Sequence, residues 1–334
     1  MASSDVDDLE EIGKLEVYID HSAAVSMFLS TGYFKSINCL REIEATVKNR
    51  TPFMLTHEAD ASKGGGALDE IKEELDDKLL RDAVFLEDMR VTTWYRIAEF
   101  QLVSLKQIAE FTLLQTPEYK GQAKLDIFVQ DELLRQHLRF TAPVILRTSP
   151  NNPGARAFAA ELERAYGSIT LKESSGSEVD NVNPTHLLLY LNMDTFRGDV
   201  GAQLASELRD ARLPIVMVHE NDPQRGGCAF ERFFQTTSGD LINSGLYKPL
   251  AFAAYAGDDH RAVGTALIAR ALGAVPNDSG SPLSDISVST VRSTSNMGNL
   301  TFRLLAFARA AIRRPRAGGD TELLALTLAK PVTM

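Results

Sequence analysis

The amino-acid sequence predicts an α/β protein built from two related domains, each with a parallel sheet flanked by helices. Three observations lead to this prediction. The chain contains an internal repeat about one domain long, and its short apolar runs alternate with amphipathic helical segments. Its 334 residues also suffice for two domains of ordinary size.

The repeat is clearest where residues 50–67 (RTPFMLTHEADASKGGGA) align with residues 212–229 (RLPIVMVHENDPQRGGCA). Eight of these eighteen positions are identical at an offset of 162 without a gap, including a His-Glu-x-Asp run and a Gly-Gly pair. A repeat of this length is a whole domain and is too long for a solenoid unit. We therefore expect a tandem duplication whose copies have diverged.

Each copy alternates apolar runs with helical patterns, which is typical of parallel strands covered on both sides. In the first copy we expect strands at residues 23–29, 53–55 and 91–94 and helices at residues 37–48 and 99–114. In the second copy we expect strands at residues 143–146, 186–191, 215–218 and 250–255 and helices at residues 155–166, 199–211 and 259–272. Only the second copy has an opening strand and helix, at residues 143–166. We therefore expect five parallel strands in the second copy and fewer in the first, which lacks this opening strand and helix.

The predicted domain boundaries follow from these elements. We expect an N-terminally incomplete first domain at residues 1–118, a linker at 119–139, a second domain at 140–275 and a flexible tail at 276–334. Within the Ser-, Pro-, Gly- and Asn-rich tail, residues 300–313 form a basic amphipathic stretch. This stretch is either a docking helix or part of a solvated tail.

Composition excludes several classes of function. No apolar run approaches the ~18–20 residues of a transmembrane helix. The net charge of −10 argues against nucleic acid or anionic lipid as a principal partner. Cys39 and Cys228 lie in separate copies without a Cys-x-x-Cys or Cys/His cluster, so we expect no metal site, no disulfide framework and a reducing, cytoplasmic location.

Several segments resemble the TIR (Toll/interleukin-1 receptor/resistance protein) family. Residues 28–44 (FLSTGYFKSINCLREIE) are similar to the central strand and following helix of a TIR domain. The His-Glu-x-Asp and Gly-Gly repeat, with residues 6–19, 95–110 and 149–155, resembles the tandem TIR-like proteins of oomycetes and unicellular algae. The resemblance implies two flavodoxin-like domains with parallel sheets flanked by helices. It also implies partners that are other TIR-type domains, including further copies of this chain.

A subset of TIR domains cleaves NAD at the nicotinamide–ribose bond with a glutamate in a Cys-x-x-Glu pattern, which the resemblance places at Glu42. A carboxylate suits this reaction because loss of nicotinamide leaves an oxocarbenium-like ribose that a nearby negative charge stabilises. Asn38 stands where the family usually has Trp, and the second copy has Leu204 in place of Glu42. The substrate-binding candidates that the resemblance implies are Ser30, Tyr33, Cys39 and His57. NAD would be a substrate, and no cofactor is expected.

The repeated His-Glu pairs, at residues 57–58 and 219–220, follow predicted strands at their carboxyl ends, where open parallel sheets bind ligands. They do not form HExxH, so a zinc protease is excluded. The repeat is either a ligand-facing loop or a structural turn in which Asp60 and Asp222 bond the backbone and glycine supplies positive φ. We favour the structural turn because the second copy keeps the motif although it has no counterpart of Glu42.

The leading functional prediction is a cytoplasmic signal-transduction or scaffolding protein that acts through homotypic TIR-type contacts. The alternative is an NAD glycohydrolase that uses Glu42, expected to be weak or inactive because the first copy lacks the opening loop. A flavodoxin-like cofactor binder ranks last, since no phosphate-binding loop is recognisable. The edge left by the missing strand is expected to drive association or to be covered by residues 125–129 or part of the tail.

Overall fold

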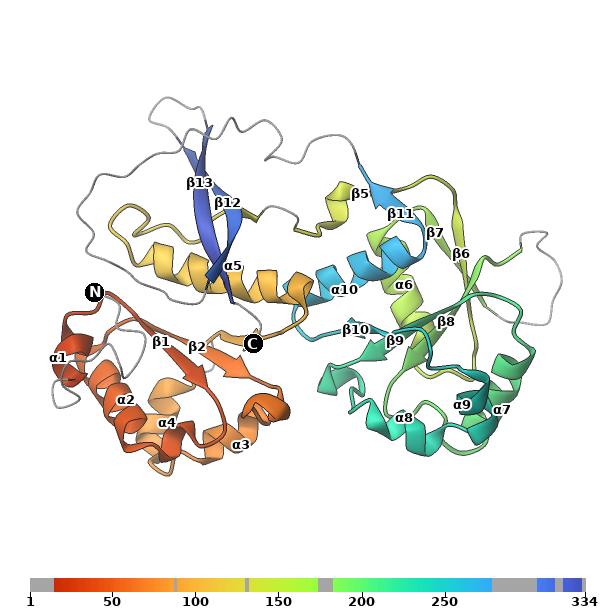
Figure 1. Ribbon diagram of the computed structural model, residues 1–334, viewed down its shortest axis with the longest axis horizontal. Helices are drawn as coiled ribbons and strands as arrows, with labels where there is room; N and C mark the ends of the chain where they lie inside the picture. Colours follow the sequence, from red (N-terminus) through yellow and green to blue (C-terminus); the bar gives the residue numbers. More distant parts are fainter. Residues whose placement is uncertain are drawn as a thin grey trace. The chain divides into compact units, whose positions relative to one another are not determined.

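The computed structural model describes residues 15–86, 89–129, 132–173 and 183–277, and the backbone of residues 305–315 and 321–331. The chain divides into two compact units (Figure 1). The first unit comprises Met1–Glu132 with Pro282–Met334, and the second comprises Leu133–Ser281. No helix in the described ranges is both long and apolar enough to cross a membrane.

The first unit contains a parallel three-stranded sheet with the order β1-β2-β3. The strands are β1 (Val25–Leu29), β2 (Phe53–Glu58) and β3 (Val91–Trp94). The helices are α1 (Leu15–Asp20), α2 (Ile37–Asn49), α3 (Leu68–Glu73), α4 (Lys78–Val84) and α5 (Ala98–Leu114), with short 3-10 turns η3 (Tyr33–Lys35) and η4 (Ala61–Lys63). Helices lie on both sides of this sheet (Figure 1).

Burial explains how the first unit is held together. On one face of the sheet, Leu55 packs with Ile43 of α2 and Val84 of α4, and all three side chains are fully buried. On the other face, Ser104 of α5 donates a hydrogen bond to the carbonyl oxygen of Thr93 at 2.6 Å. The sheet is therefore the middle layer of three, as the apolar runs predicted.

The second unit contains a parallel five-stranded sheet with the order β10-β9-β8-β6-β7. Its strands are β6 (Val144–Thr148), β7 (Ile169–Glu173), β8 (His186–Leu191), β9 (Ile215–Glu220) and β10 (Phe252–Ala254). Its helices are α6 (Ala155–Ala165), α7 (Gly198–Asp210), α8 (Glu231–Thr236), α9 (Gly239–Ser244) and α10 (Asp258–Ala271), and η6 (Pro223–Arg225) is a 3-10 turn. Numbered along this unit, the strands lie in the order 2-1-3-4-5, which is the flavodoxin-like order.

Two apolar clusters cover the two faces of the five-stranded sheet. On one face, Phe158 of α6 and Ile268 of α10 pack against Leu146 and Val218. On the other face, helices α7, α8 and α9 contribute a second cluster that includes Leu204. Both sheets are parallel and the first has fewer strands than the second, as expected from the repeat. The edge strand β7 was not among the strands expected from the sequence.

The tail differs from the sequence-based expectation of a flexible segment. Its described parts are two antiparallel strands, β12 (Leu305–Pro315) and β13 (Thr321–Pro331). The basic stretch at residues 300–313 is thus a strand from residue 305 onward and not a docking helix. Both segments are rich in apolar residues, and the sequence between them contains Gly318-Gly319, a hairpin signal that the composition of the tail obscured.

The linker also differs from expectation. Its strand β4 (Ile127–Val129) pairs with β12, and the side chains of Ile127 and Val129 lie in one apolar cluster with Leu102 of α5. Residues 119–132 therefore belong to the first unit, and residues 125–129 do not cover β1. Among the described residues, β1 pairs only with β2. In the second unit, β5 (Leu138–Phe140) pairs antiparallel with β11 (Ala274–Pro276) after the 3-10 turn η5 (Arg135–His137).

Candidate functional site

The flavodoxin-like order places the candidate ligand site of the second unit at the carboxyl ends of β6 and β8, where the strand order reverses. Three side-chain hydrogen bonds join the loop that follows β6 to strand β8 and to the loop that follows β8. Asn152 donates to the carbonyl oxygen of Tyr190 at 2.7 Å and accepts from its backbone N–H at 2.8 Å. Asn192 donates to the carbonyl oxygen of Pro153 at 2.9 Å.

The two asparagines extend the pairing of β6 and β8 beyond the backbone ladder. Both side chains are buried, with 3% of Asn152 and 6% of Asn192 exposed. Gly154, which precedes α6, has a φ of 82°, and a Cβ there would lie 2.6 Å from the Tyr190 ring. The crevice at this switch point is therefore filled by the protein's own groups.

A buried charge network lies beside this crevice. Glu220, which is fully buried at the end of β9, accepts a 2.5 Å hydrogen bond from the Tyr190 hydroxyl and a 2.8 Å bond from the backbone N–H of Asp222. Arg261 of α10 contacts Glu220 at 3.1 Å and Glu161 at 2.6 Å. Burial, followed by Glu220, raises the pKa of Tyr190, so the tyrosine stays a donor.

Arginine charges offset the buried carboxylates. Burial alone would raise the pKa of Glu161, but Arg261 and then Arg225 outweigh it and lower that pKa. The guanidinium of Arg261 also lies 5.3 Å from the centre of the Phe158 ring. Because each carboxylate has an arginine partner, the network is a structural support for the carboxyl ends of the strands.

The repeated His-Glu-x-Asp motif has the same geometry in both units. His57 Nε2 donates to the carbonyl oxygen of Gly66 at 2.8 Å, and His219 Nε2 donates to that of Cys228 at 2.7 Å. Glu58 accepts from the backbone N–H of the motif's aspartate at 2.9 Å, as Glu220 does in the second unit.

The aspartates and glycines complete the turn. Asp60 accepts from the N–H of Ser62 at 2.9 Å, and Asp222 accepts from that of Gln224 at the same distance. The following residues, Gly64 and Gly226, have φ values of 82° and 80°, which glycine adopts without strain. A Cβ on the next glycine of each copy would lie within 3 Å of backbone atoms. The structural turn predicted from the repeat is therefore confirmed.

An arginine also holds the motif glutamate of the first unit. Arg96 forms an ion pair with Glu58, whose side chain is 1% exposed. The Nε atom of Arg96 also lies 3.9 Å from Oδ2 of Asp60. Sequence reasoning missed both Arg96 and Arg261. Arg96 lies 38 residues after Glu58, and Arg261 lies 41 residues after Glu220. Because this spacing differs between the two copies, neither a local motif nor the repeat marks these arginines.

The other candidates of the first unit gather around the start of α2. Glu42 is half-buried, and burial raises its pKa. Burial also raises the pKa of Tyr33, with smaller contributions from Cys39 and Glu42, so these three side chains are close enough to interact. The backbone of Ser30 accepts from the Tyr33 N–H at 3.0 Å. In the described part of the chain, no hydrogen bond or ion pair joins His57 to this group.

Leu204 occupies the position in α7 that matches Glu42 and is 2% exposed within the core. Glu42 thus places a carboxylate where the second copy has an apolar core residue. Trp94, at the end of β3, packs edge to face on Phe28, with 6.2 Å between the two ring centroids.

The two pockets described in the structure lie away from these candidate residues. One pocket of about 320 Å³ lies at the start of β2, and another of about 550 Å³ lies near the start of β7. Neither is lined by Ser30, Tyr33, Cys39, Glu42 or His57. Among the described residues, no group of three His, Cys, Asp or Glu side chains is placed to hold a metal ion.

Comparisons with models of protein families, with curated proteins and with solved structures found no significant match to this chain. The class defined by the structure is an α/β protein whose second unit has a flavodoxin-like strand order.

Proposed function

We propose that this chain is a TIR-like signal-transduction or scaffolding protein of the cytoplasm that acts through protein–protein contacts between TIR-type units. The resemblance of residues 28–44 to the TIR family and the flavodoxin-like order of the second sheet support the proposal. The single observation that carries it is the outer edge of β1 in the first unit.

Strands β1 and β8 stand at the same position in the two copies but have different surroundings. Tyr190 of β8 is 3% exposed and stacks on Phe158 of α6 at 5.3 Å. Its counterpart on β1, Phe28, is 45% exposed. No described strand pairs with the outer edge of β1, so this strand combines an exposed apolar ring with backbone groups that can pair with another strand.

A second copy of the chain is the partner that this edge fits best. Two β1 strands related by a two-fold axis would pair antiparallel, with Phe28 of each copy on the shared surface. The net charge of −10 opposes such pairing, so added salt should strengthen it.

Sedimentation velocity of the full chain over a range of concentrations tests this proposal. The wild-type chain should associate reversibly, and Phe28→Asp should shift it to the monomer because a charge replaces the apolar contact. Phe234→Asp is the matched control, since Phe234 is 52% exposed on the second unit. A wild-type chain that stays monomeric at ~100 μM, well above weak micromolar affinities, or equal effects of the two substitutions would refute the proposal.

The second candidate function is NAD hydrolysis by Glu42. It is favoured by the burial that raises the Glu42 pKa beside Tyr33 and Cys39. It ranks below the first because catalysis needs a substrate held in a defined geometry, and neither pocket described above includes Glu42.

A further inference from the structure

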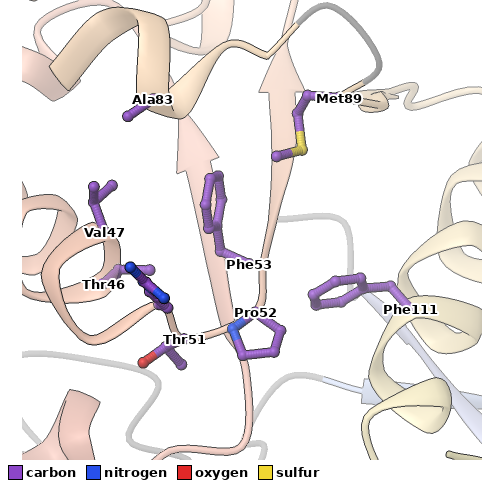
Figure 2. A pocket seen from close by; sticks show the side chains of 9 residues that line it. Thr46, Val47, Thr51, Pro52, Phe53, Ala83, Met89 and Phe111 are labelled. Carbon is purple, nitrogen blue, oxygen red and sulfur yellow. The ribbon is translucent and has the colours of Figure 1, made fainter. Parts of the chain in front are cut away.

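A pocket of about 320 Å³ lies at the start of β2 in the first unit, formed by α2, α4 and α5 together with the strand. Figure 2 shows Phe53 of β2 projecting between Val47 and Phe111, with Ala83 and Met89 nearby. This position is at the amino-terminal end of the strand, whereas the repeated turns lie at the carboxyl ends.

The pocket wall is mostly apolar and has polar groups at one side. Its nine lining residues are Thr46, Val47, Arg50, Thr51, Pro52, Phe53, Ala83, Met89 and Phe111. The volume is at the lower end of the ~300–1,000 Å³ of small-molecule pockets, so a ligand would be small.

Arg50 is the only charged residue of this lining. Its side chain is exposed, and it forms no ion pair with a carboxylate in the part of the chain that the structure describes. Its backbone has a φ of 54° and a ψ of 32°, the left-handed conformation that usually selects glycine at the end of a helix. An arginine at this position is therefore held at the pocket despite a backbone cost.

The second copy provides an internal comparison. Leu213 stands where the first copy has Thr51, and it packs against the apolar core with Ile215, the counterpart of Phe53. Helix α7 ends at Asp210, and Ala211 continues in an extended conformation with no left-handed residue. The left-handed arginine and the neighbouring hydroxyl are therefore specific to the first unit.

We propose that this pocket binds a small apolar molecule that carries one carboxylate. The apolar part would contact Phe53, Met89 and Phe111, and the carboxylate would accept paired hydrogen bonds from the Arg50 guanidinium, whose planar fork matches that geometry. The Thr51 hydroxyl would supply a further donor. This site is independent of the β1 edge that carries the proposed function.

Calorimetric titration of the full chain with octanoate tests the proposal, with 1-octanol as the uncharged probe of similar shape. Saturable binding of octanoate is expected, with octanol at least about tenfold weaker because it lacks the charge-assisted hydrogen bonds. Arg50→Gly should weaken octanoate binding about tenfold and leave octanol binding unchanged. This variant should fold at least as stably as the wild type, since glycine relieves the left-handed backbone.

Two further variants separate the pocket from a general charge effect. Arg212→Gly removes the matching arginine of the second copy and should leave octanoate affinity unchanged. Ala83→Leu should fill the pocket and abolish binding of both probes, while its melting temperature reports whether the unit still folds. No saturable octanoate binding, equal affinity for the two probes, or equal effects of Arg50→Gly and Arg212→Gly would overturn the proposal.

Discussion

Replacing Arg261 with methionine should lower the free energy of unfolding of the second unit by about 3 kcal/mol. The arginine side chain is 8% exposed, and its partner Glu220 is fully buried. Methionine keeps most of the volume but leaves the carboxylate without its opposite charge, and breaking a buried pair in this way costs ~3–5 kcal/mol. We expect the lower value because the Tyr190 hydroxyl and the Asp222 N–H still bind Glu220.

The matched control is Arg96→Met in the first unit. Arg96 also binds a buried glutamate of the repeat, Glu58, but its own side chain is 43% exposed. Water can reach the vacated side of Glu58, so the expected loss is about 1 kcal/mol. The two substitutions thus compare the same motif with different access of solvent.

Urea unfolding of the full chain provides the measurement. Trp94 is the single tryptophan and lies in the first unit, so its fluorescence follows that unit while circular dichroism follows both. Arg261→Met should shift the circular dichroism transition more than the fluorescence transition, and Arg96→Met should shift the fluorescence transition modestly. A loss below ~1 kcal/mol for Arg261→Met, the size of a surface ion pair, would refute the assignment of this network as a structural support.

Three further predictions concern single side chains. Because burial raises the folded pKa of Glu42 above its ordinary 4.5, ionisation destabilises the folded chain as the pH rises through that raised value, so Glu42→Leu should raise the melting temperature at neutral pH. This gain should shrink below about pH 3.5, where the carboxyl group is almost fully protonated in both states; an equal gain at both pH values would contradict the reasoning. Gly227→Ala should cost about 2 kcal/mol, measured by urea unfolding, because its Cβ would lie 2.6 Å from the backbone of Asn221, and an unchanged midpoint would count against the tight turn. Asn152→Ala should cost about 2 kcal/mol by removing two buried hydrogen bonds to Tyr190, with faster amide exchange in β8 as the local readout.

The sequence predicted those parts of the fold that depend on local pattern. The apolar runs located β3 at residues 91–94 and β8 at residues 186–191 as the structure has them. The repeat predicted that the His-Glu-x-Asp segment is a turn, because its glycines and aspartates are residues that turns require.

Elements that depend on distant partners were not predicted. Strand β12 carries a helix-like basic pattern in isolation and is a strand because it pairs with β13 and β4. For the same reason, β4 joins the tail strand and not the edge of β1. The pairing of Glu58 and Glu220 with arginines also follows from three-dimensional proximity and has no signal at a fixed spacing.

The proposed function is contact with other TIR-type units, with weak or no hydrolysis of NAD. The most direct test is nicotinamide release by the purified full chain, measured beside Glu42→Ala at matched concentration. We expect that release by the wild type does not exceed that of the variant. Robust release that disappears in Glu42→Ala would contradict it and would make this protein a hydrolase.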